Sequence, residues 1–189
     1  MAQEEYFSVS YALALNVEPL ADNESLPTVE QFEREIPLPF RVASECGNIE
    51  HSLELDLAHL KREENKTLMN YLANQNTKLN LLLSFMLSQQ DDNRFRYQSE
   101  SFGASQFCYK SNTELSVGTL ARVKLFLEHP PAAIYCYAEV TTSKPDGEQF
   151  LTELRYLHLS ESDRDLLIRA ALYQQQQLLK KRANQRLED

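Results

Sequence analysis

Glycine is scarce in this chain, with four glycines among 189 residues. A loop that cradles phosphates needs several glycines close together, because its backbone must approach the ligand and adopt φ angles that other residues avoid. Serine, histidine and aspartate all occur, but no nucleophile elbow accompanies them. The sequence therefore predicts a protein that is not an enzyme.

Cysteine is also rare, and histidine is not arranged for metal binding. Three cysteines, an odd number without close spacing, indicate neither a disulfide framework nor a zinc knuckle: Cys46, Cys108 and Cys136. His51 and Glu54 form a lone i, i+3 pair, whereas a metal site in a helical bundle needs two such pairs. We expect no metal site and no certain cofactor.

Positive charge and long apolar runs are both in short supply. The formal net charge is −9, which argues against a nucleic-acid or anionic-membrane binder, because both require a basic face. The most apolar window, Leu79–Leu87, is interrupted by Asn80 and Ser84 and is far shorter than the roughly 18 residues of a membrane span. The acidic segment Met1–Tyr6 lacks the apolar run of a signal peptide. We predict no nucleic-acid partner, no membrane insertion and a cytoplasmic location.

The longest regular pattern predicts one long helix between residues 48 and 90. Its apolar residues recur every eleven positions, a period of about 3.67 residues per turn, so the apolar stripe stays nearly parallel to the helix axis. Such a helix would be roughly 60 Å long, and a small domain cannot cover its whole stripe. We predict a coil seam that meets other copies of the chain, formed by Leu57, Leu60, Leu68, Tyr71, Leu72, Leu79, Leu82, Leu83 and Met86.

An alternative is a helix that breaks near Asn74–Asn76 and folds back on its own domain. Polar Glu64 and Gln75 within the seam favour the coil, because such residues fix register and strand number. The stripe is broader than a two-stranded seam needs, and its period suits a straight bundle. We expect a homotetramer, with a homodimer as the alternative.

Strand patterns lie on both sides of the long helix. Apolar residues alternate over residues 7–17 and predict a half-buried strand that completes a barrel with the C-terminal half. Pro37 and Pro39 predict an extended segment at 38–42. Five more strands follow, at residues 95–100, 106–110, 119–128, 133–142 and 149–159, with tight turns between them.

Two further helices are predicted from capping signals. Thr28 and Gln31 have capping-box spacing for a short helix that ends near Glu35. Ser160 caps a last helix over residues 161–187. The basic run 180–182 suits the negative end of that helix dipole, and phosphate binding is the alternative reading.

The predicted organisation is an α+β fold, a small antiparallel β-barrel with an inserted long coiled-coil-like helix and a C-terminal helix. Residues 1–47 hold the first barrel strand, a short helix and a connector. Residues 48–92 form the oligomerisation helix, and residues 93–189 form the rest of the barrel and the last helix.

Three short motifs follow one another in the C-terminal half. They are a corner with Ser99, Ser101, Gly103 and Ala104, a turn with Leu115, Val117, Gly118 and Thr119, and a closing strand and helix start with Leu154, Arg155, Tyr156, Leu159, Ser160, Asp163 and Arg164. In this order and spacing the segment 99–169 resembles a PilZ domain. The resemblance covers about half of the chain and implies a small barrel tied to bacterial cyclic di-GMP signalling.

The resemblance also implies a ligand site, from which this sequence departs. The family carries two arginines, four residues apart, ahead of the first strand, because the planar guanidinium binds phosphate with two parallel hydrogen bonds. Here that place holds Gln3, Glu4 and Glu5.

The corner motif and the closing strand depart from the family as well. The family corner reads Asp-x-Ser-x-x-Gly, so Ser99 replaces the aspartate, Ala104 replaces the last glycine, and only Ser101 matches. Glu153 stands where the family often has glycine and adds a negative charge. We expect the usual nucleotide site to be largely lost.

Three functions remain open at this stage. The first is a non-enzymatic adaptor that binds an unidentified protein partner and oligomerises through its long helix. The second is a cyclic di-GMP receptor with a relocated site around Arg94 and Arg96, which alternate with Phe95 and would project to one side together, with Ser99 and Ser101 nearby. Ordinary surface charge is the other explanation of these arginines. The third function is a purely structural oligomer.

Overall fold

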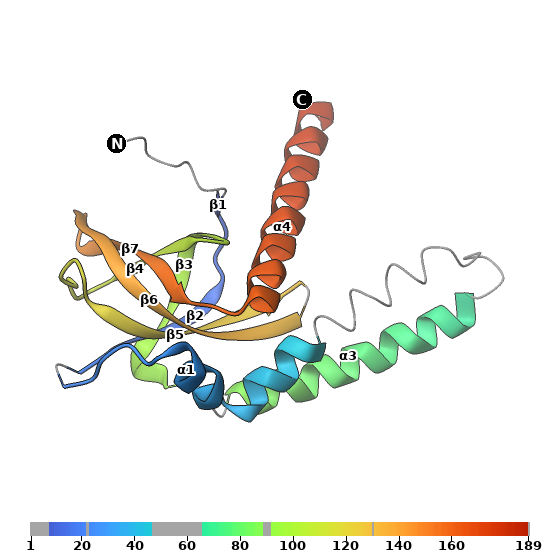
Figure 1. The fold of residues 1–189 in the computed structure, drawn as a ribbon. Helices are drawn as coiled ribbons and strands as arrows, with labels where there is room; N and C mark the ends of the chain where they lie inside the picture. The colour runs from blue at the N-terminus through green and yellow to red at the C-terminus, as the bar shows by residue number, and fades with distance from the viewer. Residues whose placement is uncertain (1–7, 22, 47–65, 89–91, 130, 189) are drawn as a thin grey trace.

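The computed structural model describes residues 8–21, 23–46, 66–88, 92–129 and 131–188 (Figure 1). The strands are β1 (Ser8–Val9), β2 (Ala14–Pro19), β3 (Arg96–Gly103), β4 (Gln106–Ser111), β5 (Leu120–Glu128), β6 (Pro131–Asp146) and β7 (Gln149–His158). The helices are α1 (Val29–Glu35), α3 (Lys66–Ser88) and α4 (Glu161–Glu188), together with a helical segment at residues 38–46 and a 3-10 turn, η1 (Asn93–Phe95).

The sheet of the described residues closes on itself. Its strand order is β1-β3-β2-β5-β6-β7-β4, and β4 also pairs with β3. Six antiparallel strands therefore form a barrel, and β1 lies outside this ring beside β3. The predicted α+β fold with a small antiparallel barrel and a C-terminal helix is confirmed.

The N-terminal segment completes the barrel, as predicted. On β2, Leu15 faces Tyr97 of β3 on one side and Leu125 of β5 on the other. The prediction of one uninterrupted strand is wrong, because β1 and β2 are separated by residues 10–13, where the Leu13 amide bonds the Tyr11 carbonyl at 3.1 Å. Both pieces still pair with β3, so the break kinks the segment without removing it from the sheet.

The barrel interior is filled by residues that alternate along the strands. β5 shows the period of two expected for a half-buried strand, with every second side chain buried. The first half of α4 closes the core from one end with Leu166, Leu167, Ala170 and Ala171. Removing α4 would expose this end of the core.

The capping box predicted at Thr28 is present. The Thr28 hydroxyl accepts the Gln31 amide, and the Gln31 side chain accepts the Thr28 amide, so α1 begins at Val29. Two otherwise unpaired amides at the start of the helix are thereby satisfied.

Residues 38–46 are helical, so the predicted extended segment 38–42 is wrong. The Pro37 carbonyl accepts the amides of Phe40 at 2.9 Å and Arg41 at 3.2 Å. Both prolines of this segment therefore lie at the start of a helix, where a missing N–H has no intrahelical acceptor to lose.

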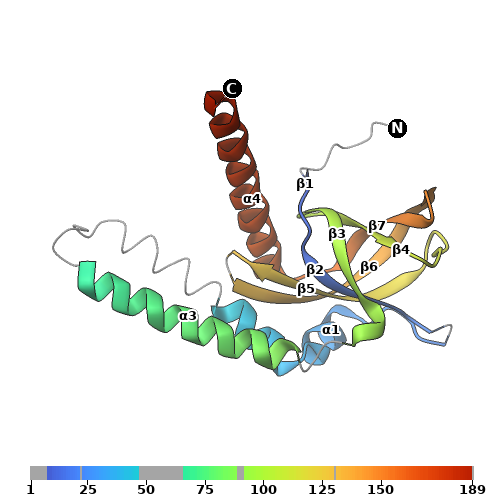
Figure 2. The same cartoon turned by 180° about the vertical axis from the view of Figure 1, so that it is seen from behind.

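A second, smaller core lies on the outside of the barrel. There α1, the helix of residues 38–46 and the end of α3 cover the outer face of β6 (Figure 1). The buried members of this cluster are Phe32, Phe40, Ala43, Leu83, Leu87, Ala133, Tyr135 and Tyr137. The base of α3 is therefore fixed to the barrel, and from this base α3 and α4 leave the barrel in different directions (Figure 2).

Candidate functional site

The predicted ligand corner begins at Ser99, and both hydrogen-bonding roles of its hydroxyl are used within the fold. Ser99 is buried, and its Oγ donates to the Tyr11 carbonyl at 2.7 Å and accepts the Leu13 amide at 2.9 Å. These partners belong to the segment between β1 and β2. The side chain therefore holds the N-terminal segment against β3.

Ser101 lies on the half-exposed outer surface of the barrel beside a carboxylate. It faces Cys108 across the β3–β4 pair, and Cys108 faces Glu153 across the β4–β7 pair. Glu153 accepts the Cys108 thiol at 3.8 Å and the Thr141 hydroxyl at 3.3 Å. Burial raises the pKa of the Cys108 thiol, and the neighbouring Glu153 raises it further. A negative carboxylate therefore occupies this surface, where it opposes an anionic ligand.

The other side of the corner is bonded to α4. Arg164, in the first turn of α4, donates from Nη1 to the Ala104 carbonyl at 2.6 Å. The Tyr156 amide of β7 bonds the Ser105 carbonyl at 3.0 Å. The backbone of the corner is therefore held from two directions, and Ala104 places a methyl group where the family has glycine.

Arg94 and Arg96 lie at the entry to β3, but Arg94 belongs to η1. Strand alternation therefore does not apply to Arg94. The Arg94 guanidinium donates from Nη2 to Asp92 Oδ2 at 2.7 Å and from Nε to Asp92 Oδ1 at 3.2 Å, and it lies 5.4 Å from the centre of the Phe95 ring. Hydrogen bonds from Arg94 lower the pKa of Asp92 to about 2. Arg96 pairs with Asn16 of β2 in the sheet and is exposed.

The described residues of the predicted seam all lie on α3, and the seam itself stays a prediction. The helix runs from Lys66 to Ser88 without a break at Asn74–Asn76. Leu83 is buried against the barrel together with Leu87, which the sequence did not single out. The remaining described seam residues are exposed: Leu68, Tyr71, Leu72, Leu79, Leu82 and Met86. Leu57, Leu60 and Glu64 lie outside the described residues, as do Gln3, Glu4 and Glu5.

No family model matches the chain, and neither does any curated protein. Among solved structures the chain is similar to a tetrameric PilZ-domain protein from Xanthomonas campestris that self-assembles via a helical bundle. The TM-score is 0.56 at 20% sequence identity, over 94% of this chain and 93% of that one. The fold is PilZ-like. The chain is also similar to the Inhibitor of motility (MotI/DgrA) of Bacillus subtilis, with a TM-score of 0.50 and 11% identity, over 94% of this chain and 53% of that one. The chain thus spans about half the length of the Bacillus protein.

A polar contact that the sequence did not reveal joins the helix of residues 38–46 to α4, which packs on the PilZ-like barrel. Ser44, on the helix of residues 38–46, donates its hydroxyl to the carboxylate of Asp163 in the first turn of α4. Asp163 is buried, and its amide donates to Ser160 Oγ at 3.1 Å. Burial raises the pKa of Asp163, and the Ser44 hydrogen bond opposes that rise. The buried Asp163 carboxylate therefore connects the helix of residues 38–46 to the start of α4.

Ser44→Ala is expected to lower the free energy of unfolding by about 1–3 kcal/mol, because it removes a hydrogen bond from the buried Asp163 carboxylate. The loss of stability in this variant depends on pH. In the folded protein the pKa of Asp163 lies above that of the unfolded chain, and the variant raises it further. The additional free energy of unfolding is therefore lost as the pH rises from the unfolded pKa to the folded pKa. Urea unfolding should therefore show a larger loss at pH 7 than at pH 4. Ser25→Ala, in an exposed loop, is the control, and an equal loss in both variants would contradict the role of this contact.

Among the described helices, none is both long and apolar enough to cross a membrane. Within the same part of the chain, no three histidine, cysteine, aspartate or glutamate side chains gather as metal ligands.

Proposed function

We propose that this chain is a non-enzymatic regulatory adaptor, linked to bacterial cyclic di-GMP signalling, that assembles into a homotetramer through α3 and acts on a protein partner. The exposed apolar stripe of α3 carries the proposal. The similarity to a tetrameric PilZ-domain protein that assembles via a helical bundle supports it. The three free cysteines accord with a reducing cytoplasmic location, which we include in the proposal.

The energetic case for assembly rests on the part of α3 that leaves the barrel. Leu68 and Leu79 are 53% and 62% exposed, and Tyr71 is 59% exposed. Most of the stability of a helix in a protein comes from packing of its apolar face against other elements. Fully burying one leucine side chain contributes about 1.5–3 kcal/mol, so several such residues from each chain can offset the entropy lost on association. A bundle of α3 helices would therefore stabilise both the projecting part of α3 and the assembly.

The case against a working nucleotide site rests on the corner of the barrel. The Ser99 hydroxyl has both a donor and an acceptor role within the fold, and the Glu153 carboxylate lies on the same surface as Ser101. A dianionic ligand there would meet a like charge in place of the arginine pair that the family uses. The adaptor would then transmit a signal through protein contacts and not through its own nucleotide.

Calorimetric titration with cyclic di-GMP is expected to give no binding heat up to tens of micromolar. A micromolar or tighter response would contradict the adaptor proposal and favour the relocated receptor site. Arg94 supports that alternative by its exposure, with 79% of its side chain accessible, although Asp92 already pairs with it.

The double variant Arg94→Ala, Arg96→Ala separates the two outcomes if binding is seen. Loss of at least tenfold in affinity would assign the ligand to these arginines, because each can supply a charge-assisted contact to phosphate. Unchanged affinity in the double variant would exclude the relocated site. Lys144→Ala, at an exposed position of β6, serves as a control for the loss of one positive charge elsewhere on the barrel and should leave the affinity unchanged.

A further inference from the structure

The C-terminal helix extends past the barrel that supports its first half (Figure 1). α4 has 28 residues and is therefore about 42 Å long. Its buried side chains end at Gln174, Leu178 is half-buried, and residues 179–185 are all exposed. Two helical turns with no tertiary support contribute little stability by themselves. We therefore expect the distal half of α4 to pack against another molecule.

The side of α4 that faces away from the barrel carries a mixed stripe. Ile168, Leu172, Gln175 and Leu179 follow one another at spacings of four, three and four residues, which places them on one face of the helix. The three apolar members are 37%, 45% and 57% exposed, respectively. The residues that enter the barrel core lie on the other side of α4. The stripe is thus open along its length.

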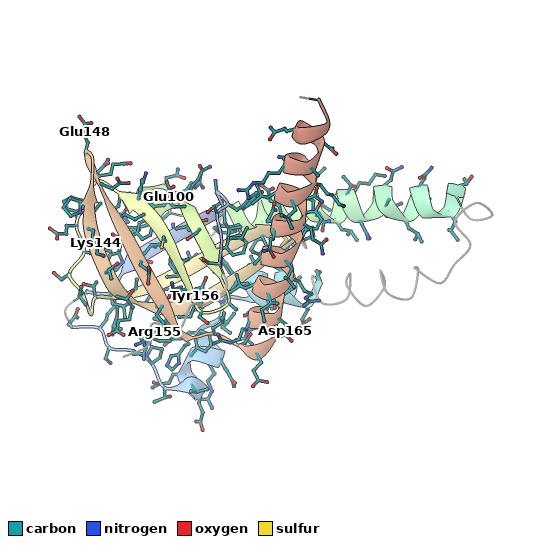
Figure 3. All side chains as sticks on the ribbon, turned by 90° about the horizontal axis from the view of Figure 1, so that it is seen from above. Glu100, Lys144, Glu148, Arg155, Tyr156 and Asp165 are labelled. Atoms are coloured by element: carbon teal, nitrogen blue, oxygen red, sulfur yellow. The ribbon has the colours of Figure 1, made fainter. Side chains whose placement is uncertain are left out.

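Charges of opposite sign flank this stripe. Asp165 precedes Ile168 by three residues, and Arg182 follows Leu179 by three, and both charged side chains are exposed. Viewed from above, Asp165 lies at the end of α4 that meets the barrel (Figure 3). From the barrel outwards, an acidic residue, apolar residues and a basic residue therefore follow one another along this face of α4.

This order is self-complementary in an antiparallel pair of helices. If the pair is centred between Tyr173 and Gln174, positions equally far from the centre face each other. Asp165 then faces Arg182, Ile168 faces Leu179, and Leu172 faces Gln175 of the other copy. The acidic position meets the basic one, Ile168 meets Leu179 between that pair and the centre, Leu172 meets Gln175 at the centre, and the two helix dipoles run in opposite directions.

We propose that α4 pairs with α4 of a second copy of this chain in a two-fold symmetric, antiparallel contact centred between Tyr173 and Gln174. The contact uses the same stripe on both copies, as two-fold symmetry requires. Each barrel packs on the far side of its own helix, so the barrel of one copy lies beside the distal half of the other. The contact is separate from α3 and does not depend on the bundle proposed above, and in the assembled protein it pairs copies of the same tetramer.

Cysteine cross-linking tests the register directly in the full chain. Cys46 is exposed, so it is first replaced by serine, and Ile168→Cys and Leu179→Cys are made singly in that background. Positions 168 of two antiparallel helices in this register are about 16 Å apart along the axis, which exceeds the reach of a disulfide. Oxidation should link the two variants when they are co-expressed and link neither variant with itself. No mixed disulfide, or a disulfide in either variant alone, would overturn the proposal.

Charge reversal tests the flanking pair. Asp165→Arg and Arg182→Asp should each weaken the α4 contact at least tenfold in sedimentation velocity, and the double variant should restore it to within about threefold, because the pair is then reversed. Lys181→Glu, exposed but off the stripe, should leave the contact unchanged. Failure of the double variant to recover would contradict the register.

The α3 background separates this proposal from the bundle. With Leu68→Asp and Leu79→Asp in α3, the α4 contact should persist as a monomer–dimer equilibrium that Asp165→Arg shifts to monomer. A monomer that shows no such equilibrium in the α3 variant at tens of micromolar would overturn the α4 contact and leave the bundle untouched. A tetramer insensitive to the α3 changes would contradict the bundle instead.

Discussion

Deletion of residues 1–20 is expected to unfold the barrel that the rest of the chain forms. β2 lies between β3 and β5, so its loss opens the ring and leaves two unpaired strand edges. It also removes Leu13, Leu15 and Val17 from the core, which are 2%, 0% and 1% exposed. At about 1.5–3 kcal/mol for each side chain, the loss is comparable to the whole stability of a small domain. Circular dichroism and thermal melting should show no cooperative transition.

A point variant sharpens this test. Leu15→Asp places a charge in the core and should unfold the protein, whereas Ala14→Asp, on the exposed side of the same strand, should change the stability by less than about 1 kcal/mol. A soluble fragment of residues 91–189 that melts cooperatively would contradict the role given to the N-terminal strand.

The double variant Leu68→Asp, Leu79→Asp is expected to abolish assembly through α3 and leave the barrel folded. Both leucines are exposed on the part of α3 that projects from the barrel, so no barrel contact is lost. A carboxylate at either position would have to be desolvated inside a bundle, which costs several kcal/mol. Light scattering should fall to a dimer or below, since the α4 contact can join only two copies, and the strand signal in circular dichroism should persist.

The matched control adds the same charge to the opposite face of the helix. Asn70→Asp, Asn74→Asp carries two new carboxylates at exposed positions about half a turn away from the stripe. It should retain the wild-type mass. Equal dissociation in both variants would show that added charge, and not the stripe, controls assembly.

The sequence predicted those parts of the fold that local patterns determine. Alternation along 119–128 predicted β5, and the Thr28 and Gln31 pair predicted the start of α1. The helix of residues 38–46 was missed because its two prolines were interpreted as helix breakers, although proline is favoured in the first turn of a helix. Burial of Phe40 against the barrel adds a tertiary contact that no local pattern reveals.

The site was harder to predict because its geometry depends on contacts between distant segments. The sequence placed Ser99 at a ligand corner, but its partners Tyr11 and Leu13 come from the other side of the long helix. The adjacency of Ser101, Cys108 and Glu153 follows from the register of β3, β4 and β7, which no local motif specifies. The shared carboxylate of Asp163 is equally invisible to a local pattern.

The mass of the wild-type protein in solution tests the central claim most directly. Multi-angle light scattering at tens of micromolar should give four times the 21.9 kDa of one chain. The same measurement on the Leu68→Asp, Leu79→Asp variant should give no more than twice that value. A wild-type mass of one chain, or a mass that the α3 variant leaves unchanged, would contradict assembly through α3.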